Sequence, residues 1–326
     1  MKSHTCDFSP RALLPLALGP LLPLVVFAVA MQVGARSNLL PAPRPTLDTE
    51  RTVLIHQAEA ACSPQDAEVI LLGDSSCLMN VSARQLGESL RRPVLNLGTF
   101  SFLDVNSHAA MVREYTRANP GRLRAVVLLM HAETLRRLGA ETFYADALEN
   151  FWAGRDHAAS GFWDGQLNQA LGVDIFKGRL LARALPLPLG GAYGRRYGFT
   201  TDLEHYLSAH RGSAVDPDPQ PLTGSPEYRL ARTLEKASKN FRAAVPDGVK
   251  LFVGITPAPE RFAGVKYPAL RDAMLAEWSG WIDGVALTNL PATMPDTNFV
   301  RTTHLTEPAI SNYTAALSAA LSSLRR

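Results

Sequence analysis

The stretch that most constrains the fold is AEVILLGDSSCL, at residues 67–78. Its apolar run at 69–72 is typical of a central parallel strand that is buried on both faces of a sheet. Gly73 permits a sharp turn, and each of the three polar residues after it can cap a helix. This order places Ser75 at the carboxyl end of a sheet, where α/β folds bind their ligands. Ser75 is therefore a candidate nucleophile if a base reaches it, and a helix cap without chemistry is the alternative.

Composition excludes several classes of function. The chain has 326 residues, of which 46% are hydrophobic, enough for one large α/β core or two smaller ones. Because its 33 basic and 30 acidic residues nearly balance and form no long basic run, we expect no nucleic-acid partner. The three cysteines fit no zinc spacing, and we expect no required disulfide. The chemistry considered below implies no metal and no organic cofactor.

The N-terminal segment indicates a membrane location. Residues 12–34 carry no charged side chain, and a helix of about 20 apolar residues spans a bilayer. Lys2 and Arg11 precede this segment and favour a cytoplasmic N-terminus. A cleaved signal peptide ending near residues 28–30 is the alternative. Both readings place the rest of the chain outside the cytoplasm.

Periodicity beyond this segment predicts one α/β domain. We expect residues 1–36 to form a cytoplasmic stub and membrane anchor, 37–66 a linker with a short helix, and 67–326 the domain. Residues 134–224 break the α/β rhythm and are interpreted as an insertion whose aromatic side chains could line a substrate groove or simply pack. Short helical crossovers predict parallel strands, at 69–72, 93–97, 124–130, 250–256 and 285–290.

A histidine near the C-terminus is a candidate base. His304 lies in RTTHLTE, just before the last predicted helix. Loops that follow the first and last strands of a parallel sheet face the same edge, so His304 and Ser75 can meet. An imidazole there could take the serine proton and return it to a leaving group. The alternative is a surface histidine beside a helix cap made by Thr306.

Three motifs together resemble a known family. The order GDSS at 73–76, NLG at 96–98 and HLTE at 304–307, followed by a terminal helix, is similar to the SGNH/GDSL hydrolase superfamily. The resemblance implies Ser75 as nucleophile, the Gly98 N–H as an oxyanion donor and His304 as base. It is closest to membrane-anchored, extracytoplasmic members that accompany membrane-bound O-acyltransferases and acylate cell-surface polysaccharides, some of them from bacterial exopolysaccharide loci such as those for cellulose.

Two positions depart from the family pattern. Arg301 stands where the family has the aspartate of Asp-x-x-His, so Asp296 in the same loop is the candidate third member, unless a Ser-His dyad suffices. We expect Arg301 to point toward solvent or substrate. The third strand ends without the family's asparagine. His131 could donate to an oxyanion in its place, whereas Glu133 would repel one.

The sequence therefore predicts a three-layer, flavodoxin-like α/β fold of the SGNH type behind an N-terminal transmembrane helix. The expected activity is ester cleavage or O-acyl transfer on an extracytoplasmic polysaccharide, with a membrane-bound O-acyltransferase as partner. We expect a single-pass protein of the bacterial inner membrane with its domain in the periplasm. The competing hypothesis is a catalytically degenerate carbohydrate-binding or scaffold subunit of an exopolysaccharide synthesis complex.

Overall fold

The computed structural model describes most of the chain as two compact units. The larger unit contains described residues of Thr46–Glu149 and Leu187–Arg326, and the smaller one those of Met1–Pro45 and Asn150–Pro186. The described residues are 15, 18–37, 39–41, 49–100, 103–137, 148, 151–153, 170–181, 185, 187–223 and 227–325.

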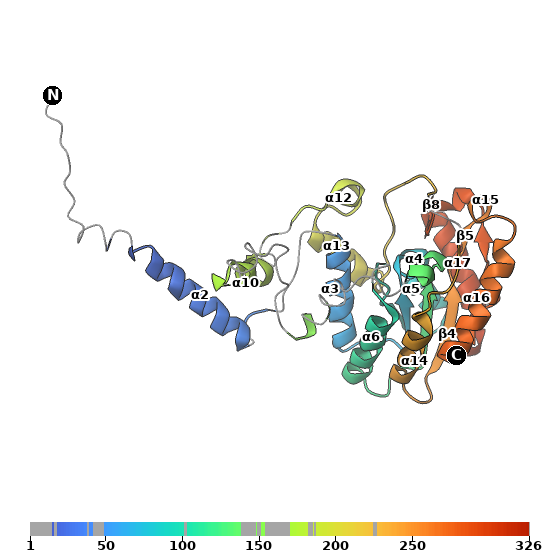
Figure 1. Ribbon diagram of the computed structural model, residues 1–326, viewed down its shortest axis with the longest axis horizontal. Helices are drawn as coiled ribbons and strands as arrows, with labels where there is room; N and C mark the ends of the chain where they lie inside the picture. Colours follow the sequence, from blue (N-terminus) through green and yellow to red (C-terminus); the bar gives the residue numbers. More distant parts are fainter. Residues whose placement is uncertain are drawn as a thin grey trace, which may run out of the picture. The chain divides into compact units, whose positions relative to one another are not determined.

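A five-stranded parallel sheet forms the centre of the larger unit (Figure 1). Its spatial order is β2-β1-β3-β4-β6, and every neighbouring pair is parallel. All five predicted strands are confirmed, although the last is shorter than expected and is followed by Leu287 and Leu290, whose side chains are buried in the core. The strands are β1 (Val69–Gly73), β2 (Val94–Asn96), β3 (Ala125–Met130), β4 (Lys250–Ile255) and β6 (Val285–Ala286).

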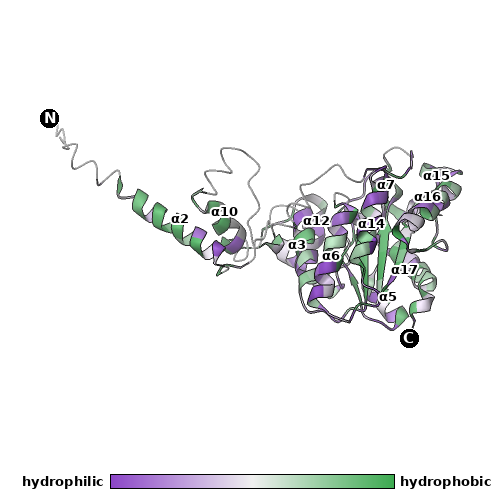
Figure 2. Ribbon diagram, turned by 60° about the horizontal axis from the view of Figure 1, so that its bottom comes forward, coloured by the Kyte–Doolittle hydropathy of each residue, from purple (hydrophilic) through white to green (hydrophobic). Residues whose placement is uncertain are grey.

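Helices cover both faces of the sheet. On one face α5 (Ala83–Leu90) and α17 (Glu307–Ala320) pack against the side chains of Val69 and Leu71. On the other lie α6 (Val105–Ala118), α14 (Leu234–Ala244) and α16 (Tyr267–Ile282). Figure 2 shows hydrophobic strands between helices with hydrophilic outer surfaces. The result is a three-layer, flavodoxin-like α/β architecture, in which two covered faces explain the unbroken apolar strands.

Part of the predicted linker belongs to this unit. Helix α3 (Thr49–Cys62) packs against α6 and α13 (Thr200–Ala209), and its Val53, Leu54 and Ile55 side chains are buried. The predicted insertion is also divided. It starts with α7 (Ala132–Arg137), and its later portion returns to the larger unit as α12 (Gly191–Tyr197) and α13.

The smaller unit contains α2 (Leu21–Arg36), α10 (Val173–Ile175) and the π-helical turn η1 (Phe176–Leu181). The rings of Phe27 and Phe176 meet edge to face, with centroids 5.7 Å apart. None of the helices within the described ranges combines the length and the apolar character needed to cross a bilayer. Residues 12–14, 16 and 17 of the predicted span lie outside those ranges.

Two short pairs of strands complete the larger unit. Strand β5 (Ala258–Pro259) pairs with β7 (Thr293–Met294) in parallel. Strand β8 (Phe299–Arg301) and β9 (His304–Leu305) form an antiparallel hairpin in which Arg301 is the register partner of His304. His304, the candidate base, therefore lies on this hairpin.

Candidate active site

The turn after β1 presents Ser75 at the start of a helix. Gly73 has a φ of 146°, and a Cβ built there would lie 1.7 Å from the carbonyl oxygen of Leu129, so only glycine fits. Helix α4 (Ser75–Asn80) then begins, with Asp74 as its N-cap. Ser75 is buried, with an exposed fraction of 6% for the whole residue. The predicted strand-turn-helix geometry around this serine is therefore present.

Asp74 has a structural role, as its position before the serine suggested. Its Oδ1 accepts from the Ser76 N–H at 2.9 Å and from the Ser76 hydroxyl at 2.5 Å. Its Oδ2 accepts from the His131 backbone N–H at 2.9 Å, and Thr256 Oγ1 donates to Ser76 Oγ at 2.8 Å. Because these bonds join the loops that follow β1, β3 and β4, they hold the carboxyl edge of the sheet in one arrangement.

His304 is fastened to the same helix that Ser75 begins. The Asn80 side chain donates to the Thr303 carbonyl at 3.0 Å and accepts from the Leu305 N–H at 2.8 Å, so it binds the chain on both sides of the histidine. His304 Nε2 is buried and has no hydrogen-bond partner in the described part of the chain. No hydrogen bond joins it to Ser75 among those residues. Catalytic hydrogen bonds commonly tighten only when substrate is bound.

The carboxylate that contacts His304 is that of Asp216, which the sequence analysis did not identify. Its Oδ2 lies 2.5 Å from His304 Nδ1, and its side chain has no exposed area. Asp296, the candidate for this place, instead accepts from the Arg261 backbone N–H at 3.0 Å. The prediction for Asp296 is therefore wrong, because the loop before β8 turns that carboxylate toward Arg261.

Backbone contacts explain how Asp216 reaches the histidine from the far end of the insertion. The Asn96 N–H donates to the Arg211 carbonyl at 2.8 Å, and the Ala214 N–H donates to the Leu78 carbonyl at 3.1 Å. The Ser213 hydroxyl accepts from the Asn96 amide at 3.2 Å. The 211–216 segment thus runs along β2 and α4, and it carries Asp216 to the hairpin. No spacing rule could have revealed a partner 88 residues away from His304.

Arg301, which we expected to point toward solvent or substrate, binds this same carboxylate and keeps 30% of its side chain exposed. Its Nε lies 2.5 Å from Asp216 Oδ2, and its Nη2 lies 3.3 Å from Asp218 Oδ2. Burial raises the pKa of Asp216, but the hydrogen bond and charge of His304, the Asp218 N–H and the Arg301 charge outweigh burial and lower it. Asp216 therefore stays ionised at neutral pH and can orient the imidazole.

His131 presents an unpaired donor. Its Nδ1 accepts from the Glu133 N–H at 3.2 Å, which leaves the ring proton on Nε2. That Nε2 is buried and has no hydrogen-bond partner among the described residues. Burial lowers the pKa of His131 against the opposing charges of Asp74 and Glu133, so the ring is neutral. Glu133 itself is paired with Arg136 and Arg137, which reduces the repulsion expected from it.

Gly98 does not aim its N–H at the site. That N–H donates to Asn96 Oδ1 at 2.8 Å, and the Gly98 carbonyl accepts from Gln57 Nε2 at 3.0 Å. A Cβ at Gly98 would lie 2.7 Å from the Leu78 nitrogen, so the glycine permits close packing against α4. Its predicted role as oxyanion donor would require this N–H to leave Asn96 Oδ1.

Comparisons with known proteins add nothing to this geometry. Neither the family models nor the curated proteins nor the solved structures contain a match to the chain. The functional argument therefore depends on the site itself.

Proposed function

We propose that the protein is a serine esterase or O-acyltransferase in which Ser75, His304 and Asp216 form the catalytic triad. The observation that carries this proposal is the buried hydrogen bond between His304 Nδ1 and Asp216 Oδ2 at 2.5 Å. It orients a histidine whose Nε2 is buried and unpartnered within the described residues. Such an imidazole is poised to accept a proton, and the serine at the head of α4 is the hydroxyl in the same site.

In the proposed reaction, the Ser75 Oγ proton passes to His304 Nε2 as Oγ attacks the acyl carbonyl carbon. The carbonyl oxygen becomes an oxyanion, which the backbone N–H of Ser75, the first residue of α4, and the His131 Nε2–H stabilise. Collapse of this intermediate breaks the ester bond, and His304 returns the proton to the leaving alcohol. A water molecule or a sugar hydroxyl then attacks the acyl-enzyme and gives its proton to His304. The bond between Ser75 Oγ and the acyl carbon breaks, and His304 returns the proton to Ser75 Oγ. Asp216 stays ionised throughout.

The setting of this reaction rests on the sequence resemblance and the uncharged 12–34 segment. We assign it to an extracytoplasmic polysaccharide at the bacterial inner membrane, with a membrane-bound O-acyltransferase as the source of acyl groups. An alkaline phosphatase fused after Arg326 should then be active in cells and remain in the membrane fraction. An inactive fusion would contradict this placement, and a soluble periplasmic one would favour a cleaved signal peptide.

Labelling with a fluorophosphonate tests the triad, because such probes phosphonylate an activated serine. Wild-type protein should carry the label on the peptide that contains Ser75, and Ser75→Ala should abolish it. Ser323→Ala, which removes an exposed hydroxyl far along the sequence, is the matched control and should label normally. Folded wild-type protein that takes no label would contradict the enzyme hypothesis.

A scaffold or carbohydrate-binding subunit is the second candidate. The lack of a hydrogen bond between Ser75 and His304 among the described residues favours it. Cells that carry Ser75→Ala separate the two functions. Loss of acyl groups from the polysaccharide supports the enzyme. An unchanged acyl content, where deletion of the whole gene lowers it, supports the scaffold.

A further inference from the structure

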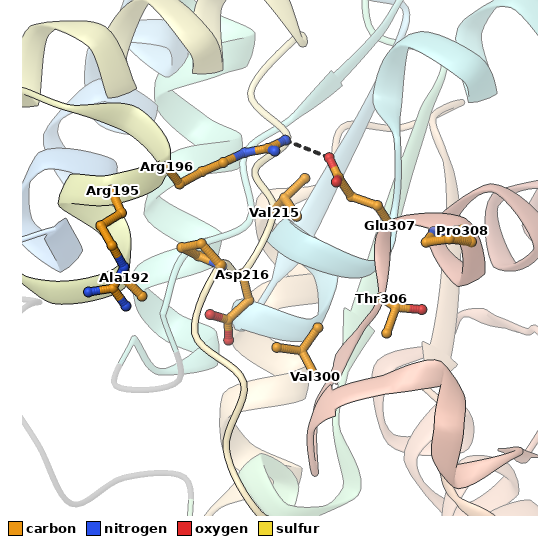
Figure 3. Close-up of a pocket in the computed structure, with 10 residues that line it drawn as sticks. Ala192, Arg195, Arg196, Val215, Asp216, Val300, Thr306, Glu307 and Pro308 are labelled. Atoms are coloured by element: carbon orange, nitrogen blue, oxygen red, sulfur yellow. Dashed lines mark hydrogen bonds and ion pairs between the residues drawn. The ribbon is translucent and has the colours of Figure 1, made fainter.

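A groove with a volume of about 420 Å³ opens beside the triad acid (Figure 3). Helix α12 forms one wall, and the first residues of α17 form the wall opposite. Asp216 lies between them, and Thr306, two residues after His304, lines the α17 side. The volume is within the range of small-molecule sites. A molecule in this groove would therefore lie next to the proposed catalytic residues.

One of the two arginines that line the groove has no pairing partner among the described residues. Asp216 is paired with His304 and Arg301. Arg196 reaches across from α12 to Glu307 of α17 at 2.5 Å, as the dashed line in Figure 3 marks. Arg195 is exposed and forms no ion pair or hydrogen bond with any described residue. Arg195 is therefore the charged side chain of the groove that has no partner among the described residues, and a ligand could pair with it.

The apolar part of the lining is small and rigid. It consists of Ala192, Val215, Pro217, Val300 and Pro308. Short side chains flanked by two arginines and a glutamate suit a compact polar group with an apolar face, such as a sugar ring, better than a flexible acyl chain. An arginine donates two parallel hydrogen bonds to a carboxylate or phosphate.

We propose that this groove binds an oxyanion, a carboxylate or phosphate on a sugar unit of the acyl acceptor, with Arg195 as its donor. The link to an acyl acceptor rests on the proposed function, but binding of the anion does not. The Arg196–Glu307 ion pair bridges the two walls of the groove. Since its side chains are 39% and 53% exposed, the pair is weak and can open for a ligand.

Calorimetric titration of the intact Ser75→Ala protein tests the proposal without turnover. The probes are tetragalacturonate for a carboxylate, glycerol phosphate for a phosphate, and cellotetraose as the neutral oligosaccharide. We expect one of the anions to bind and Arg195→Gln to weaken it about tenfold or more, the usual worth of a charged hydrogen bond. Arg232→Gln, an exposed arginine on another part of the unit, is the control and should bind as the parent does.

A second variant shifts affinity in the opposite direction. Glu307→Gln removes the negative charge and releases Arg196, so it should tighten anion binding several-fold. The identity of the anion that responds distinguishes the carboxylate from the phosphate. Equal binding of cellotetraose, no binding of either anion, or an unchanged affinity in folded Arg195→Gln would overturn the proposal. Fluorophosphonate labelling of Ser75 is a separate result, so a failure of the triad and a failure of the groove are distinguishable.

Discussion

Replacing Asp216 by asparagine should reduce acyl transfer far more than it reduces stability. Asp216 Oδ1 accepts from the Asp218 N–H at 3.0 Å and from Arg301 Nη2 at 3.2 Å. These two donors would hold the carbonyl oxygen of an asparagine at the same position. The new NH₂ group would then face His304 Nδ1, because it takes the place of Oδ2.

That exchange changes the tautomer of His304. An NH₂ group cannot accept a hydrogen bond from Nδ1–H, so the ring must carry its proton on Nε2. A protonated Nε2 has no lone pair left to take the proton of Ser75. The same change in a serine protease triad lowers kcat by about 10⁴, and we expect a loss on the order of 10³–10⁴ here. The cost in folding should be about 1–3 kcal/mol, since Arg301 keeps its contact with Asp218.

The assay is the single-turnover rate of p-nitrophenyl acetate cleavage, with thermal melting to confirm that each variant folds. Asp296→Asn is the matched control, because it makes the same chemical change in a carboxylate that binds only the Arg261 N–H among the described residues. It should retain activity within about twofold, as a surface hydrogen bond is worth little to catalysis. Equal rates for folded Asp216→Asn and Asp296→Asn would refute the assignment of Asp216.

Three further expectations concern other residues of the larger unit. His131→Phe should slow acyl transfer by about 10²–10³-fold, the usual effect of removing one oxyanion donor from an enzyme. An unchanged rate, in a variant whose folding thermal melting has confirmed, would contradict the role of His131 as that donor. Asn80→Ala should lower kcat with little change in KM, since it frees the chain on both sides of His304; an effect on KM alone would argue against positioning. Burial lowers the pKa of the fully buried His108 to about 4, so the unfolded chain takes up a proton below pH 6.5 that the folded one refuses. Stability should therefore fall between pH 6.5 and about 4 by about 3 kcal/mol in urea titrations, and His108→Gln should remove most of that dependence.

Local patterns in the sequence were enough to predict the sheet and the turn that precedes Ser75. The apolar run at 69–72 predicted a buried strand because only a strand covered on both faces tolerates an unbroken apolar series. Gly73 and the polar residues after it predicted the turn and cap, and Asp74 caps Ser76 as expected. These features depend on neighbours a few residues apart, so the sequence contains all of the relevant information.

Tertiary contacts decided which groups complete the site. Asp216 belongs to a segment that looked like an insertion, and hydrogen bonds to Asn96 and Leu78 bring it to His304. In the folded chain Arg301 forms an ion pair with the Asp216 carboxylate, and Asp296 accepts a hydrogen bond from the Arg261 backbone N–H. A side chain's partner across the fold depends on how loops from separate strands meet at the sheet edge. The sequence by itself therefore determined the sheet and the positions of the candidate serine and histidine, and only the packed structure decided which carboxylate lies against that histidine.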